Sequence, residues 1–137
     1  MTERLFVDMT VFAYAGGGPH ELREACRALL ALASTGDAQL HASVEVVQEY
    51  LFHRLRKVAR PQALAEARDV TAMCLLHPFD TDVLELSLAL VESSGVRGRD
   101  AVHAATALQH GFDTIVTADR DFDQVPGLTR VDPRTLA

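Results

Sequence analysis

Two short apolar runs, each closely followed by an aspartate, constrain the fold of this chain more than any other feature. The run at 5–7 ends at Asp8, and the run at 114–117 is followed by Asp119. Runs this short, bounded by turn-type residues, are typical of buried strands in a parallel sheet. In open α/β sheets the ligand crevice lies outside the carboxyl ends of the strands. These two carboxylates therefore mark the place where chemistry is expected.

Apolar runs of this kind alternate with segments of helical periodicity. We expect strands at about 4–8, 40–42, 74–77, 114–117 and 128–131, and helices at about 20–34, 43–58, 61–73, 81–94 and 100–110. Glycines 16–18 with Pro19 are expected to form a loop, and Gly36 to end the first helix. Ser43 is a predicted N-cap, as is Thr81 or Asp82. The alternation predicts an α/β fold with a mainly parallel sheet of about five strands, forming one domain over residues 1–137.

Composition favours a folded protein of the reducing cytoplasm. Of the 137 residues 48% are hydrophobic, no apolar stretch reaches membrane-spanning length, and no signal-peptide pattern is present. Cys26 and Cys74 lack the spacing of a zinc site or a disulfide framework, so we expect two small core residues. The net charge of −6 argues against a nucleic-acid partner. A site built from carboxylates and divalent cations weakens that argument, because bound metal neutralises its acidic residues.

Each acidic candidate also has a purely structural interpretation. Asp8 or Thr10 can cap a short helix at 10–14, and Asp119 can belong to an Asp-rich turn whose carboxylates bond to backbone amides. Asp100 at a helix N-terminus complements the helix dipole. Periodicity places Glu49 on an exposed face, although flanking apolar residues also fit the border of a cleft. It lies nearly opposite the main apolar stripe, which consists of Val47, Tyr50, Leu51, Leu55 and Val58.

The acidic residues gain meaning as a set. Adjacent parallel strands lie roughly 5 Å apart, so Asp8 and Asp119 can share a cation if their strands are neighbours. Four carboxylates in one crevice, with Glu49 and Asp100 added, would repel one another and raise one another's pKa. A divalent cation removes that repulsion, and carboxylate oxygens are the ligands that Mg²⁺ and Mn²⁺ prefer. The four residues are therefore expected to converge only around metal.

Three other phosphate chemistries lack a required residue. A phosphotransfer enzyme of the haloacid-dehalogenase type needs a second acid two residues after the first, where this chain has Thr10. A receiver domain needs a lysine after a late strand, whereas Lys57, the only lysine, ends a predicted helix. A P-loop needs a glycine-rich turn that ends in Lys-Ser or Lys-Thr, and residues 16–19 have none. A non-catalytic α/β module that binds a partner, with the carboxylates as caps, remains as the alternative.

Four stretches in their order and spacing resemble the PIN-domain family, and within it the VapC-type toxins of toxin–antitoxin modules. They are Phe-Val-Asp-Met-Thr at 6–10, Glu49 inside a helix, Arg-Asp-Ala-Val-His-Ala-Ala-Thr-Ala at 99–107, and Ile-Val-Thr-Ala-Asp-Arg-Asp-Phe at 115–122 followed by Pro-Gly-Leu at 126–128. The resemblance covers essentially the whole chain. One mild departure is Met9-Thr10, where the family often has a small hydroxyl residue directly after the aspartate.

The resemblance implies an α/β/α sandwich and a Mg²⁺- or Mn²⁺-dependent endoribonuclease, in which metal-activated water attacks a phosphodiester. It further implies a homodimer and a cognate antitoxin whose C-terminal segment covers the active-site groove. Transfer RNA is the substrate that the family suggests, with ribosomal and messenger RNA as open alternatives. The implied residues are Asp8, Glu49, Asp100 and Asp119 as catalytic metal ligands and Thr10, Thr117 and Asp121 as auxiliary groups. Arg97, Arg99 and Arg120 are candidates for RNA phosphate contacts, with ordinary exposed arginines as the alternative. The histidines at 20, 41, 53, 77, 103 and 110 are expected in the core or at the surface rather than in catalysis.

Overall fold

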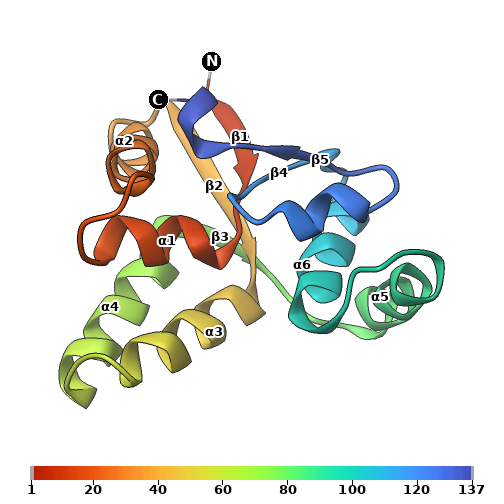
Figure 1. Ribbon diagram of the computed structural model, residues 1–137, viewed down its shortest axis with the longest axis horizontal. Helices are drawn as coiled ribbons and strands as arrows, with labels where there is room; N and C mark the ends of the chain where they lie inside the picture. The colour runs from red at the N-terminus through yellow and green to blue at the C-terminus, as the bar shows by residue number, and fades with distance from the viewer. Residues whose placement is uncertain (1, 137) are drawn as a thin grey trace.

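A computed structural model describes residues 2–136 and contains two parallel sheets that meet at one point. The first sheet has the order β1-β2-β3, and the second pairs β4 with β5. Their bounds are Glu3–Phe6 for β1, Ala38–Ser43 for β2, Cys74–His77 for β3, Thr114–Val116 for β4 and Thr129–Val131 for β5. A parallel bridge between Val7 and Val116 joins the sheets. The carboxyl ends of β1 and β4 therefore lie side by side (Figure 1), which confirms the parallel sheet as three plus two strands.

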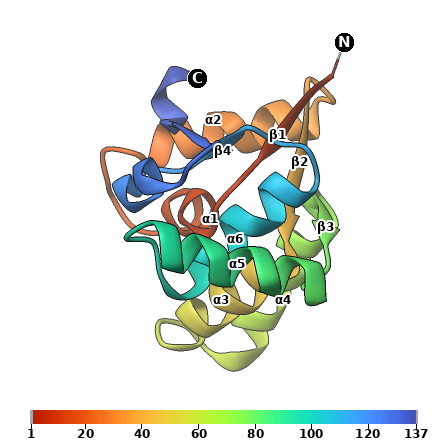
Figure 2. The ribbon, with the colours of Figure 1, turned by 90° about the vertical axis from the view of Figure 1, so that its right-hand side faces the viewer.

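Helices cover both faces of these strands. They are α1 (Met9–Gly16), α2 (Arg23–Ser34), α3 (Val44–Leu55), α4 (Arg60–Met73), α5 (Thr81–Ser93) and α6 (Gly98–Gln109), with 3-10 helices η1 (Arg120–Gln124) and η2 (Pro133–Thr135). Neighbouring strand residues point to opposite faces: Leu5 and Val7 pack with α1 to α4, and Phe6 packs with α5 and α6. Figure 2 shows α5 and α6 in front of the strands. The predicted α/β/α sandwich is confirmed.

Most helix boundaries differ slightly from the sequence prediction. The short helix considered at 10–14 forms as α1, which extends into the expected loop as far as Gly16, and the helix expected from residue 20 begins at Arg23. Asp80 caps α5 by accepting a hydrogen bond of 2.9 Å from the Val83 amide, so the prediction of Thr81 or Asp82 was wrong. The predicted domain extends to residues 1 and 137, which lie outside the described range.

Gly36 and Cys26 behave as expected, whereas Cys74 is only partly buried against the core. Gly36 follows the end of α2 with a φ of +84°, a conformation that L side chains rarely adopt. Cys26 is buried and Cys74 is half-buried, and both are free thiols. None of the described helices combines the length and the apolarity needed to span a bilayer.

Candidate metal centre

Five acidic residues gather at the carboxyl edge of β1 and β4. Asp8 follows β1, Glu49 lies in α3, Asp100 lies in the first turn of α6, and Asp119 and Asp121 follow β4. The oxygens of Asp100, Asp119 and Asp121 lie within 4.8 Å of one another, as do the ligand atoms of Asp8, Glu49 and His103. The sheet thus brings together acids that are separated by more than a hundred positions in the chain.

Burial and the neighbouring carboxylates both act on the pKa of Asp100. Burial raises the pKa of its carboxyl from the ordinary value of 3.8 to about 7, and the nearby charges of Asp8, Asp119 and, more weakly, Glu49 contribute to the increase. His103 acts in the opposite direction. The two clusters therefore form one electrostatic centre, because Asp100 responds to members of both.

Asp8 is held by hydroxyl groups rather than used as a helix cap. It is 3% exposed, and its Oδ2 accepts hydrogen bonds from the Thr117 hydroxyl at 2.8 Å and the Thr10 hydroxyl at 3.0 Å. The two hydroxyl oxygens are themselves 3.2 Å apart. Although Asp8 occupies the N-cap position of α1, its side chain makes no capping bond. The structural interpretation of Asp8 as a cap is therefore wrong, and both predicted auxiliary threonines lie at its carboxylate.

Asp119 combines a turn with the acidic cluster. Its Oδ1 accepts a hydrogen bond of 2.9 Å from the Asp121 amide, which caps η1 and confirms the predicted Asp-rich turn. Its own amide donates to the Thr117 hydroxyl at 3.0 Å. Thr117 consequently links Asp8 to Asp119 through one oxygen. The turn orients Asp119 toward Asp100 and does not exclude it from the centre.

Glu49 is not on an exposed face, which corrects the expectation from periodicity. The buried residues of α3 are Val46, Tyr50 and Arg54, so the stripe built on Val47, Leu51 and Leu55 was misplaced. The reason is that α3 packs against α1, α4 and α6. The side chain of Glu49, one turn beyond Val46 on the helix, is 23% exposed and borders the buried face.

Ser43 and His103 belong to the centre although the sequence reasoning left them out. Both are fully buried. The Ser43 hydroxyl lies 2.9 Å from His103 Nδ1, and His103 Nε2 lies 3.5 Å from Glu49 Oε1 without forming a hydrogen bond within the described chain. Ser43 occupies the predicted N-cap position of α3 but makes no side-chain capping bond. The three-residue spacing of Asp100 and His103 on one helix face was the signal that would have found the histidine.

Two of the three predicted arginines lie at the centre. A hollow of about 440 Å³ is lined by Arg97 and Arg99 together with Glu49, Asp100 and Asp121. Arg120 is exposed and is absent from that lining. Cations therefore stand on one side of the carboxylates, where they can attract a phosphate backbone.

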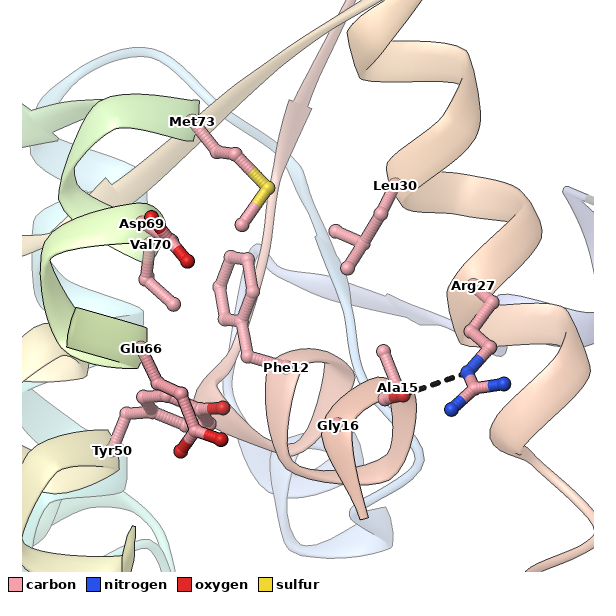
Figure 3. Close-up of a pocket in the computed structure, with 10 residues that line it drawn as sticks. All are labelled: Phe12, Ala15, Gly16, Arg27, Leu30, Tyr50, Glu66, Asp69, Val70 and Met73. Carbon is pink, nitrogen blue, oxygen red and sulfur yellow. Dashed lines mark hydrogen bonds between the residues drawn. The ribbon is translucent and has the colours of Figure 1, made fainter. Parts of the chain in front are cut away.

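A separate pocket has an apolar lining and lies away from the carboxylates of the centre. Its volume is about 250 Å³, and Phe12, Leu30, Val70 and Met73 converge on it from α1, α2 and α4 (Figure 3). Glu66 and Asp69 add acidic groups to the wall, and Arg27 Nε donates to the Ala15 carbonyl at 2.9 Å. None of the five acidic residues of the centre lines this pocket.

The residues of the centre fit a hard divalent cation. Carboxylate oxygens dominate the donor set, without a thiolate among the described residues of either cluster. Oxygen-rich sets select Mg²⁺ and Mn²⁺, whereas thiolates select softer metals. Burial, and after it the charges of Asp8 and Asp119, raise the pKa of Asp100, and a bound cation would favour the ionised carboxylate against these effects.

Known proteins are similar to this chain over most of its length. The model of the PIN domain family matches residues 5–128. Ribonuclease VapC7 of Mycobacterium tuberculosis is 32% identical over 132 residues, which cover 94% of this chain and 91% of that protein.

Solved structures share the fold. The DNA-bound VapBC of Salmonella typhimurium aligns with a TM-score of 0.74 at 18% identity, covering 97% of this chain and 99% of that chain. VapBC-5 of Mycobacterium tuberculosis, a member of the VapBC family of toxin–antitoxin systems, aligns with a TM-score of 0.60 at 26% identity and covers 93% and 97%.

Proposed function

This chain belongs to the PIN domain family, and on that premise we propose that it is a metal-dependent endoribonuclease that acts as the toxin of a toxin–antitoxin pair. The observation that carries the proposal is the convergence of Asp8, Glu49, Asp100 and Asp119 at one sheet edge. A relative at 32% identity bears the name ribonuclease, which supports the same reaction class.

The four carboxylates and Asp121 would hold the cation, Mg²⁺ with Mn²⁺ as a substitute. When bound, the ion supplies a water of lowered pKa and offsets charge on the phosphate oxygens. Asp8 is already oriented for this task, since two hydroxyls fix one of its oxygens. Burial and the charges of Asp8 and Asp119 raise the pKa of Asp100 to about 7, so this carboxyl would hold a proton more readily than an exposed one until a cation bound beside it. Arg97 and Arg99 would hold the RNA phosphates beside the centre.

The proposed macromolecular partners are RNA, an antitoxin and a second copy of the chain. Transfer or ribosomal RNA is the proposed substrate, and the cytoplasm is the proposed location. The antitoxin would cover the active-site groove with its C-terminal segment and place a basic side chain near the carboxylates. Its apolar anchors would find a matching surface in the pocket of Figure 3. The toxin–antitoxin membership of a solved relative at 26% identity supports this proposal.

A cleavage assay tests the proposed function. Purified protein should cut structured RNA with Mg²⁺ or Mn²⁺, and EDTA should stop the reaction. Asp8→Asn and Asp119→Asn should abolish cleavage while each variant retains its thermal midpoint within a few degrees. Asp82→Asn, which neutralises an exposed carboxylate in the first turn of α5, is the matched control and should cut normally. Unchanged cleavage by both centre variants would refute the assignment, and binding of a protein partner without any cleavage would favour the non-catalytic module.

A further inference from the structure

A groove leads away from the carboxylates between α1 and α3, two helices that run side by side from the centre (Figure 1). Its volume is about 360 Å³, and its lining includes Thr10, Tyr14, His20, His53 and Lys57. The groove begins at the centre itself, because the Thr10 hydroxyl donates to Asp8 Oδ2. The hollow of Arg97 and Arg99 is a separate one, because its lining shares no residue with the groove.

The far end of the groove is basic. An adjoining hollow of about 220 Å³ is lined by His53, Arg56 and Lys57, and two of these residues also line the groove. Burial lowers the pKa of His53, and the nearby charges of Lys57, Arg54 and Arg56 lower it further. Arg54 is paired with Glu66 at 2.7 Å, whereas the exposed Arg56 and Lys57 form no ion pair within residues 2–136. Two uncompensated cations therefore stand here on a chain of net charge −6.

The wall of the groove carries a flat pair of rings. Tyr14 stacks on His20 with ring centroids 4.3 Å apart and planes inclined by 21°. The His20 ring is fixed because its Nδ1 accepts a hydrogen bond of 3.1 Å from the Leu22 amide. Gly17 lies beside the rings, and a Cβ there would come within 2.8 Å of the Ala13 carbonyl oxygen. The close approach of the backbone at this position therefore requires glycine.

We infer that this groove binds the single-stranded RNA segment on one side of the cleaved phosphodiester, with bases on the Tyr14 and His20 platform and phosphates at Arg56 and Lys57. The inference rests on the proposed function and adds to it the path of the substrate. Grooves that bind single strands combine cations along the backbone with aromatic rings under the bases. Basic residues at the end of α3 also complement the helix dipole, but that role explains neither the ring pair nor the groove that continues to Asp8.

Binding of a fluorescein-labelled single-stranded RNA 20-mer, followed by anisotropy in EDTA so that the RNA stays intact, tests the inference. Lys57→Gln should weaken binding and reduce the slope of log K against log salt by about 0.7, the value for one phosphate contact on a single strand. Arg68→Gln removes the same charge from an exposed position of α4 outside the groove and should change neither quantity. Equal effects of the two variants would overturn the inference.

The ring platform has its own matched pair of variants. Tyr14→Leu should weaken RNA binding about tenfold, because the stacking surface is lost, whereas Tyr14→Phe should bind within about twofold of the original protein. Lys57 also offers a test without substitution, because it is the only lysine in the chain. RNA should slow its acetylation by an amine-reactive reagent, as measured on the peptide that contains it. An acetylation rate of Lys57 that RNA leaves unchanged would contradict an RNA groove. So would protection of Lys57 by polyglutamate in a protein that does not bind RNA.

These outcomes are separable from a failure of the proposed function. If the original protein cuts no RNA with any divalent cation, the proposed function fails. If it cuts RNA but the Lys57 and Tyr14 variants bind as the control does, only the path of the strand is wrong.

Discussion

Replacing Asp100 with asparagine is expected to make the metal-free protein more stable and the enzyme inactive. The pKa of this carboxyl is raised from 3.8 to about 7 by burial, Asp8 and Asp119. A carboxyl with a raised folded pKa opposes folding once it ionises, so its penalty grows as pH rises from about 4 and is complete above about 7. Asparagine keeps the shape of the side chain and removes the charge.

The size of the effect follows from the same pKa values. The ordinary pKa of 3.8 and the raised pKa of about 7 differ by about 3, and each pKa unit corresponds to about 1.36 kcal/mol. The ionised Asp100 therefore lowers the free energy of unfolding at pH 8 by at most about 4 kcal/mol. Asp100 is only half-buried, so screening by solvent reduces this to about 2 kcal/mol. The variant also loses the favourable interaction of the carboxylate with the α6 dipole, which reduces its gain in stability by about 0.5 kcal/mol. The net gain should raise the thermal midpoint by about 5 °C, at about 3–4 °C per kcal/mol for this size.

Thermal unfolding of the two proteins in EDTA at pH 8 and pH 4 measures this difference. The variant should be the more stable at pH 8 and nearly equal to the original protein at pH 4. Mg²⁺ should raise the midpoint of the original protein at pH 8 and leave the variant nearly unchanged. Asp82→Asn, in the first turn of α5, controls for the dipole alone and should show no stabilisation at either pH. A variant destabilised at pH 8 would refute the reasoning, because Asp100 would then have a structural role.

Three further substitutions test the surroundings of the centre. Thr117→Val should lower the free energy of unfolding by about 1–2 kcal/mol in denaturant titrations. It should also slow RNA cleavage, because the Asp8 carboxylate loses a hydrogen-bond donor. Normal cleavage by the variant would contradict this role of the hydroxyl. His103→Leu should weaken Mn²⁺ binding at least about tenfold by calorimetry at pH 8, because it removes the buried imidazole beside Glu49, a proposed metal ligand. An unchanged affinity for Mn²⁺ would show that His103 does not support the metal ligands. Glu66→Gln should destabilise the fold by about 2 kcal/mol at pH 7, because Arg54 is buried and loses its ion pair. The bond to Arg54 lowers the pKa of Glu66, so this difference should be present above pH 4.5 and shrink as pH falls through the lower folded pKa.

The sequence predicted which residues lie at the carboxyl edge of the sheet, but it did not predict which faces of the surrounding helices are buried. Asp8 and Asp119 could be placed together because strand ends are recognisable and parallel neighbours share an edge. Glu49 could not be placed from periodicity, since the buried side of α3 depends on three helices packed around it. Arg54 is the clearest case, because an arginine is buried there through a partner twelve residues away.

Contacts between side chains far apart in the chain could not be predicted from the sequence either. The contact between Ser43 and His103 spans sixty positions, and only the tertiary fold brings the two together. The alternative in which Asp8 caps a helix failed for a similar reason, since the hydroxyl of Thr117, directly after β4, binds its carboxylate. Local rules gave the Asp-rich turn at Asp119 correctly, because the carboxylate and the Asp121 amide lie within one turn.

Anomalous diffraction from a crystal grown with Mn²⁺ tests most directly whether the four carboxylates hold metal. A manganese peak is expected at bonding distance from oxygens of Asp8, Asp100 and Asp119, with Glu49 in the same coordination shell directly or through water. The peak should disappear in crystals of Asp8→Asn. A protein that cleaves RNA yet shows no manganese at these oxygens, or binds it elsewhere, would contradict the metal centre.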